Sequence, residues 1–98
     1  MSNKTPRYSL ESIKTLISEG DSRITSNAIM DAAIHDMTDE DIKAVIHLLS
    51  PNDFYKSMQS HHNELIWQDV YHKLYGEIVW YIKLQIVDIA IVISFKEK

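Results

Sequence analysis

The sequence contains no cysteine and very little glycine or proline. Without cysteine, a disulfide framework and every zinc site built on thiolates are excluded. With two glycines and two prolines in 98 residues, the chain has no glycine-rich phosphate loop and is neither collagen-like nor linker-like. Basic residues are also scarce, because 10 Lys and Arg stand against 14 Asp and Glu, for a formal net charge of −4. A simple polycationic nucleic-acid binder is therefore not favoured, although a local basic patch is allowed.

Long hydrophobic runs are absent as well. The most apolar stretch, residues 78–95, contains Lys83 and Asp88 and does not resemble a membrane-spanning helix. The N-terminal residues are polar and lack the apolar centre of a secretion signal. We therefore expect a soluble, cytoplasmic protein. Its length, with 45% hydrophobic and 24% charged residue types, predicts one domain spanning residues 1–98.

Helical periodicity extends from about residue 9 to residue 49. Ser9 and Thr38 are predicted N-caps of the first and third helices, and the second helix is predicted to begin near Thr25 or Ser26. Gly20 is a predicted helix stop, and Asp41 follows Thr38 at capping-box spacing. The second helix should turn one apolar stripe toward the core, namely Ile29, Met30, Ala33, Ile34 and Met37.

From about residue 54 to residue 97 the period changes to two. The clearest alternations place Ile78, Trp80, Ile82, Leu84 and Ile86 on one face, and Ile89, Ile91, Ile93 and Phe95 on the matching face of the next strand. Residues 54–59 and 67–74 are predicted to supply two further strands. Strands with one buried face are typical of an antiparallel sheet covered on one side. The sequence thus predicts an α+β fold with N-terminal helices packed on one face of a C-terminal antiparallel sheet.

Turn positions predict the pairing of these strands. A tight turn at Val87-Asp88 would place Tyr81 opposite Ser94 and diagonal to Lys96. A turn at Tyr75-Gly76 would pair strand 67–74 with strand 78–86, with residue 70 opposite residue 81 and residue 68 opposite residue 83. The face opposite the isoleucines then collects Gln68, His72, Tyr81, Lys83, Gln85, Ser94 and Lys96.

Two ammonium groups, a phenol and an amide suit a phosphodiester. Lysines can neutralise charge that develops on phosphate oxygens, and a phenol can relay a proton if nearby cations lower its pKa. RNA supplies its own nucleophile, the 2′-hydroxyl, so this chemistry requires neither a metal ion nor a cofactor. A solvated sheet face would also be polar, and from the pattern alone that interpretation is favoured. Asp69 and Lys56 fall on the apolar face, where the alternation does not account for them.

Three segments resemble one known family. Residues 50–58 (SPNDFYKSM), 66–71 (IWQDVY) and 92–98 (VISFKEK) are closely similar to the MqsR toxins of bacterial toxin–antitoxin modules. The resemblance implies a RelE-like α+β fold and a metal-independent endoribonuclease that cuts messenger RNA without the ribosome, preferring GCU-type sites. It also implies a cognate antitoxin that carries zinc on its own chain and binds operator DNA.

By position, the resemblance assigns catalysis to Lys56, Gln68, Tyr81 and Lys96. The last three are residues that strand register had already brought to one face, whereas Lys56 rests on the resemblance alone. From their place on that face, His72 and Lys83 are expected to make weaker contacts with RNA. No metal ligand is expected.

The acidic balance departs from the generally basic character of such toxins. Residues 1–50 contain 5 basic and 8 acidic side chains, and residues 51–98 contain 5 basic and 6 acidic ones. RNA affinity is therefore expected to be weaker or more sensitive to salt. The alternative interpretation is a catalytically weak or inactive interaction module that serves as an antitoxin partner or corepressor.

Overall fold

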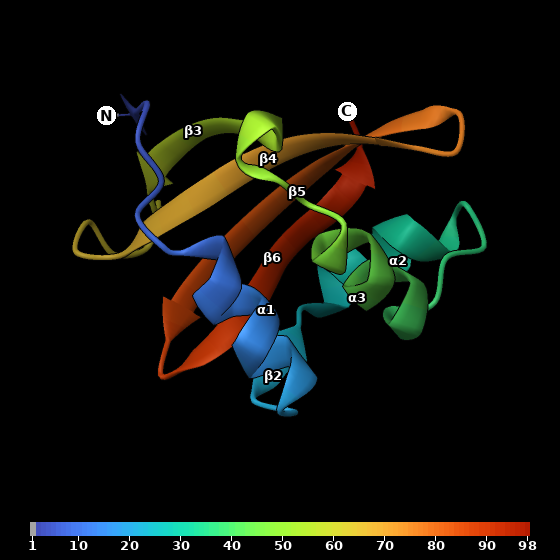
Figure 1. Cartoon of the computed structure of the whole chain (residues 1–98), viewed down its shortest axis with the longest axis horizontal. Coiled ribbons are helices and arrows are strands. Elements are labelled where there is room, and N and C mark those ends of the chain that lie inside the picture. Colours follow the sequence, from blue (N-terminus) through green and yellow to red (C-terminus); the bar gives the residue numbers. More distant parts are fainter. Residues whose placement is uncertain (1) are drawn as a thin grey trace.

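The computed structural model describes residues 2–98, which form three α-helices and a six-stranded sheet (Figure 1). The helices are α1 (Leu10–Ser18), α2 (Ser26–Ala33) and α3 (Asp39–His47), followed by a 3-10 turn, η1 (Pro51–Asp53). The strands are β1 (Ser2–Asn3), β2 (Ser22–Ile24), β3 (Phe54–Gln59), β4 (Trp67–Tyr75), β5 (Ile78–Val87) and β6 (Ile89–Glu97). The predicted α+β fold is confirmed.

The sheet has the order β1-β3-β4-β5-β6-β2, and the helices gather on one of its faces (Figure 1). Neighbouring strands are antiparallel except β2, which runs parallel to β6. The short edge strands β1 and β2 were not predicted. Within residues 2–98, no helix is long and apolar enough to cross a membrane.

The predicted helix ends are confirmed. The side chains of Ser9 and Thr25 accept hydrogen bonds from the first-turn amides of α1 and α2. Thr38 and Asp41 form the expected capping box, in which each side chain accepts a hydrogen bond from the other residue's backbone N–H. Gly20 ends α1 with a φ of 82°, a conformation that L side chains rarely adopt.

The predicted core face of α2 is wrong. Ala28 and Ala32 are the fully buried residues of this helix, whereas Met30 is 65% and Ile34 76% exposed. The helix packs closely on β6, and small side chains permit that approach. The apolar stripe favoured by periodicity therefore faces mainly outward.

The β5–β6 hairpin also differs from its predicted register. The chain reverses at Asp88, with a φ of 67°, and an irregularity leaves Ile93 as an extra residue between the pairs Leu84–Val92 and Lys83–Ser94. A bulge of this kind changes which face the following residues occupy. Because Val87 pairs with Ile89, Ala90 and Val92 lie opposite Ile86 and Leu84 and are buried, and the extra residue Ile93 then returns Phe95 to the same face, opposite Ile82. The predicted burial of the isoleucines of β6 is therefore wrong, whereas that of Phe95 is confirmed.

Strands β4 and β5 turn one position later than predicted, with Tyr75 paired to Ile78 around Gly76, whose φ is 66°. The register therefore moves by two residues, which changes the partners but preserves the faces. His72 lies opposite Tyr81, and Lys83 lies opposite Val70 instead of Gln68.

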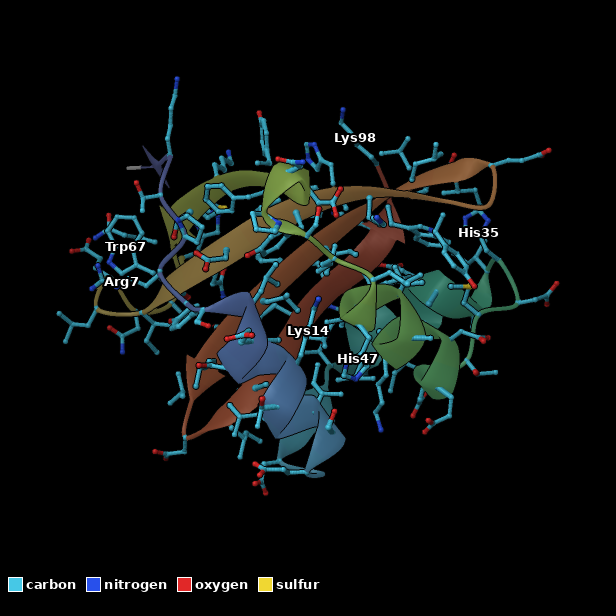
Figure 2. The ribbon with its side chains drawn as sticks, in the orientation of Figure 1. Arg7, Lys14, His35, His47, Trp67 and Lys98 are labelled. Carbon is cyan, nitrogen blue, oxygen red and sulfur yellow. The ribbon has the colours of Figure 1, made fainter. Side chains whose placement is uncertain are left out.

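Asp69 is fully buried on the core face because the N-terminal segment covers it. Its carboxylate accepts hydrogen bonds from the backbone N–H groups of Arg7 and Tyr8, at 3.0 and 2.9 Å. The Tyr8 hydroxyl donates to the Trp67 carbonyl, and the Arg7 guanidinium lies 5.3 Å from the centre of the Trp67 ring (Figure 2). These contacts explain why the Asp69 carboxylate is buried on the apolar face, which the alternation of residue types did not.

Candidate active site on the open face of the sheet

The face of the sheet turned away from the helices presents three neighbouring cross-strand rows. The tyrosine row comprises His72, Tyr81 and Lys96; the lysine row comprises Lys56, Val70, Lys83 and Ser94; and the glutamine row comprises Met58, Gln68, Gln85 and Ile91. Residues two positions apart on a strand share a face, so the rows lie roughly 7 Å from one another. All six predicted site residues thus occur on one surface.

A second irregularity, on β3, brings Lys56 to this surface. Phe54 pairs with Tyr71 on the core face, whereas Lys56 pairs with Val70 on the open face, and Tyr55 between them is the extra residue. The alternation that placed Lys56 with Phe54 is therefore wrong at this point. Lys56, which only the family resemblance had assigned to catalysis, thus lies on the same face as the residues that the predicted register had brought together.

Aromatic rings form the centre of the cluster. Tyr55 stacks on His72 with 4.3 Å between ring centres, and His72 lies 5.9 Å from the Tyr81 ring. The ammonium groups of Lys96 and Lys83 lie 5.3 and 5.8 Å from the centre of the Tyr81 ring. Cations at these distances are attracted to the ring faces, and together the groups form a basic, aromatic surface.

A third ammonium group lies at the β3 side of the cluster. The Nζ of Lys56 is 5.5 Å from the centre of the Tyr55 ring. Tyr55 is 53% exposed and had not been predicted as a site residue. In the sequence, only its position beside Lys56 pointed to Tyr55 as a site residue. The irregularity that turns Tyr55 toward His72 is not visible in the alternation of residue types.

The chemical environment shifts the ionisation of three site residues. Partial burial and the nearby Tyr55 raise the pKa of Tyr81, so this phenol is neutral near pH 7. This opposes the lowered pKa on which the expected proton relay depended; the structure instead presents Tyr81 as a hydrogen-bond donor. Burial and the charges of Lys96 and Lys56 lower the pKa of Lys83. Burial, Lys98 and Lys56 lower that of His72.

The glutamine row and Val70 of the lysine row are largely buried. Val70 is fully buried although it faces away from the helices, so its neighbours on the open face cover it. Gln68 is 7% exposed, and its Nε2 donates a 2.9 Å hydrogen bond to Oε1 of Gln85. Gln68 is separated from Tyr81 by the lysine row, farther than the predicted register implied.

Carboxylates are kept away from the three rows. Asp53 binds Lys73, Glu97 lies near His35, and Asp69 binds the N-terminal segment. Among residues 2–98, no group of three His, Asp or Glu side chains is arranged to hold a metal ion. The overall negative charge therefore does not extend into the site, whose charged members are lysines.

Comparison with known proteins identifies the family to which the chain belongs. The model of a family described as "motility quorum-sensing regulator, toxin of MqsA" matches residues 5–97. The chain therefore belongs to the MqsR toxin family, and the predicted family membership is confirmed. A curated relative from Escherichia coli (strain K12), named mRNA interferase toxin MqsR, is 35% identical over 100 residues, which cover all of both chains.

Proposed function

We propose that this toxin is an endoribonuclease that cleaves messenger RNA through the RNA's own 2′-hydroxyl, with a preference for GCU-type sites. The observation that supports this proposal most directly is the position of three lysine ammonium groups at the rings of Tyr55 and Tyr81, both of which lie against His72. Attack of the 2′-oxygen on phosphorus breaks the bond to the 5′-oxygen. The products are a 2′,3′-cyclic phosphate and a 5′-hydroxyl end.

In this mechanism Lys56 and Lys96 stabilise the negative charge that develops on the phosphate oxygens. Tyr81, neutral near pH 7, donates a proton to the departing 5′-oxygen. Lys83 and His72 contact the RNA, and Tyr55 offers an exposed ring on which a base can stack. Gln68 is held by Gln85 and acts from the edge of the site, positioning a phosphate or a base.

The proposed partner is a cognate antitoxin that binds zinc on its own chain and reaches operator DNA, so the toxin meets DNA only through it. Because messenger RNA is the proposed substrate, the activity is assigned to the cytoplasm. The second candidate function, an inactive antitoxin partner or corepressor, is favoured by the net charge of −4. The basic site on the open face argues against that alternative.

The test is cleavage of a long RNA by the purified protein in EDTA, with the 5′ and 3′ ends of the products identified. We expect chelator-resistant cleavage that leaves a cyclic phosphate or 3′-phosphate. A matched substrate with one 2′-deoxy nucleotide immediately 5′ of the cut should resist cleavage at that position only. Products with 3′-hydroxyl ends would contradict the mechanism, and no cleavage at any protein concentration would favour the interaction module.

A further inference from the structure

We propose that His72 is the general base of the reaction, taking the proton from the attacking 2′-hydroxyl. This inference rests on the proposed ribonuclease function and extends it, because the family resemblance assigned catalysis to other residues. The proton moves from the 2′-oxygen to a ring nitrogen of His72. The 2′-oxygen then bonds to phosphorus, and the 5′-oxygen departs with a proton from Tyr81.

The composition of the site supplies the first argument. A base must be unprotonated before the reaction and able to accept a proton during it, which favours a group whose pKa lies near the working pH. Lysine and tyrosine ordinarily titrate far above neutral pH, with the pKa of Lys83 lowered from that ordinary value by burial and its lysine neighbours. Amides and hydroxyls do not titrate in this range. In the three rows, His72 is the one residue that ordinarily titrates near neutral pH.

The position of His72 supplies the second argument. It lies directly opposite Tyr81 on β5, and Tyr81 lies directly opposite Lys96 on β6. A base, an acid and a charge-stabilising cation thus follow one another along one row. A phosphate bound over the His72–Tyr81 pair, whose ring centres lie 5.9 Å apart, would have the base on one side of phosphorus and the acid on the other, as in-line attack requires, with Lys96 beside Tyr81 to stabilise the developing charge.

The charged surroundings supply the third argument. The groups that face His72 are Tyr55 and Lys56 from β3, Tyr81 and Lys83 from β5, and Lys96 and Lys98 from the end of the chain. None of these is a carboxylate that would hold the imidazole in its protonated form. Burial and the charges of Lys98 and Lys56 instead lower its pKa, so the ring is neutral and ready to accept a proton at pH 7.

The test is the pH dependence of single-turnover cleavage, from pH 5 to pH 9, of one RNA oligonucleotide. For the unaltered protein the rate should rise tenfold per pH unit at low pH and level off at a midpoint below the ordinary histidine value of about 6.5. His72→Gln should lower the plateau rate by about 10²–10⁴ and remove the rising limb. His47→Gln, at the exposed end of α3 on the helical side of the molecule, should change neither (Figure 2).

Chemical rescue distinguishes catalysis by His72 from a merely structural role. In His72→Ala, added imidazole should restore cleavage in proportion to its neutral form, with protein-free RNA as the background control. A slow variant that retains the rising limb and shows no rescue would overturn the inference, because His72 would then only support the Tyr55 ring. Unchanged cleavage in His72→Gln would overturn it while leaving the ribonuclease function intact. An unaltered protein that fails to cut RNA would overturn both.

Discussion

The two faces of the sheet differ in how they are covered and in what their side chains contribute. On β5, Ile82 is fully buried under the helices, whereas its neighbour Tyr81 lies on the open face among lysines. Acidic residues gather on the helical side, as at the N-terminus of α3, where they complement the helix dipole. Because stability depends on one face and the proposed chemistry on the other, substitutions one residue apart should have opposite consequences.

The largest effect is expected on the open face. Tyr81→Phe and Lys96→Ala should each lower RNA cleavage by about 10²–10³, since each removes one contact made to the reacting phosphate. Neither opens a cavity under the helices, so the free energy of unfolding should change by only about 0.5 kcal/mol. Cleavage rates and thermal melts on the same preparations check both expectations. Loss of folding in Tyr81→Phe would contradict the assignment of faces.

The core face should respond in the opposite way. Ile82→Ala should lower the free energy of unfolding by roughly 2–5 kcal/mol, because the side chain is fully buried and its removal leaves a cavity. At a temperature where the variant is still folded, the cleavage rate should be close to that of the unaltered protein. Denaturant titration measures the first quantity. A silent Ile82→Ala would show that the two faces are exchanged.

The buried carboxylate of Asp69, on the same core face, should have the next largest effect. Asp69→Asn offers one acceptor oxygen where the carboxylate had two, so one of the amides of Arg7 and Tyr8 loses its partner. An unpaired buried polar group costs about 1–3 kcal/mol. Glu77→Gln, in the exposed β4–β5 turn, is the matched control and should be nearly neutral. Equal stability of the two variants in urea would contradict the proposed anchoring of the N-terminal segment.

The sequence predicted what depends on local chemistry. Helix caps such as Thr38 and Asp41 were found because a cap and its helix are adjacent in the chain. The shared face of Gln68, Tyr81 and Lys96 was found because alternation preserves faces even when the register is wrong by two residues.

What escaped prediction depends on the partner strand. An extra residue at Tyr55 or Ile93 is defined only by the pairs on either side of it, and each exchanges the faces of the residues that follow. The extra residue at Tyr55 determines the place of Lys56, and the one at Ile93 lets Val92 and Phe95 share the core face although they are three residues apart. The edge strand β2 escaped for the same reason, since its three residues are a strand only through their pairing with β6.

The smallest expected effect tests the irregularity at Ile93 and, with it, the comparison of the two faces. Alternation places Ile93 in the core and Val92 outside it, whereas in the structure Val92 is 1% exposed and Ile93 is only half-buried. Val92→Ala should therefore lower the free energy of unfolding by about 2 kcal/mol, for the two buried carbon groups removed and the cavity left behind.

Ile93→Ala removes more carbon but should lower the free energy of unfolding by about 1 kcal/mol less than Val92→Ala. Both variants replace a β-branched residue of the same strand, so the loss of strand propensity largely cancels in the difference. Paired urea titrations measure that difference directly, and a larger loss in Ile93→Ala would restore the uninterrupted alternation and return Tyr81 to a position opposite Ser94.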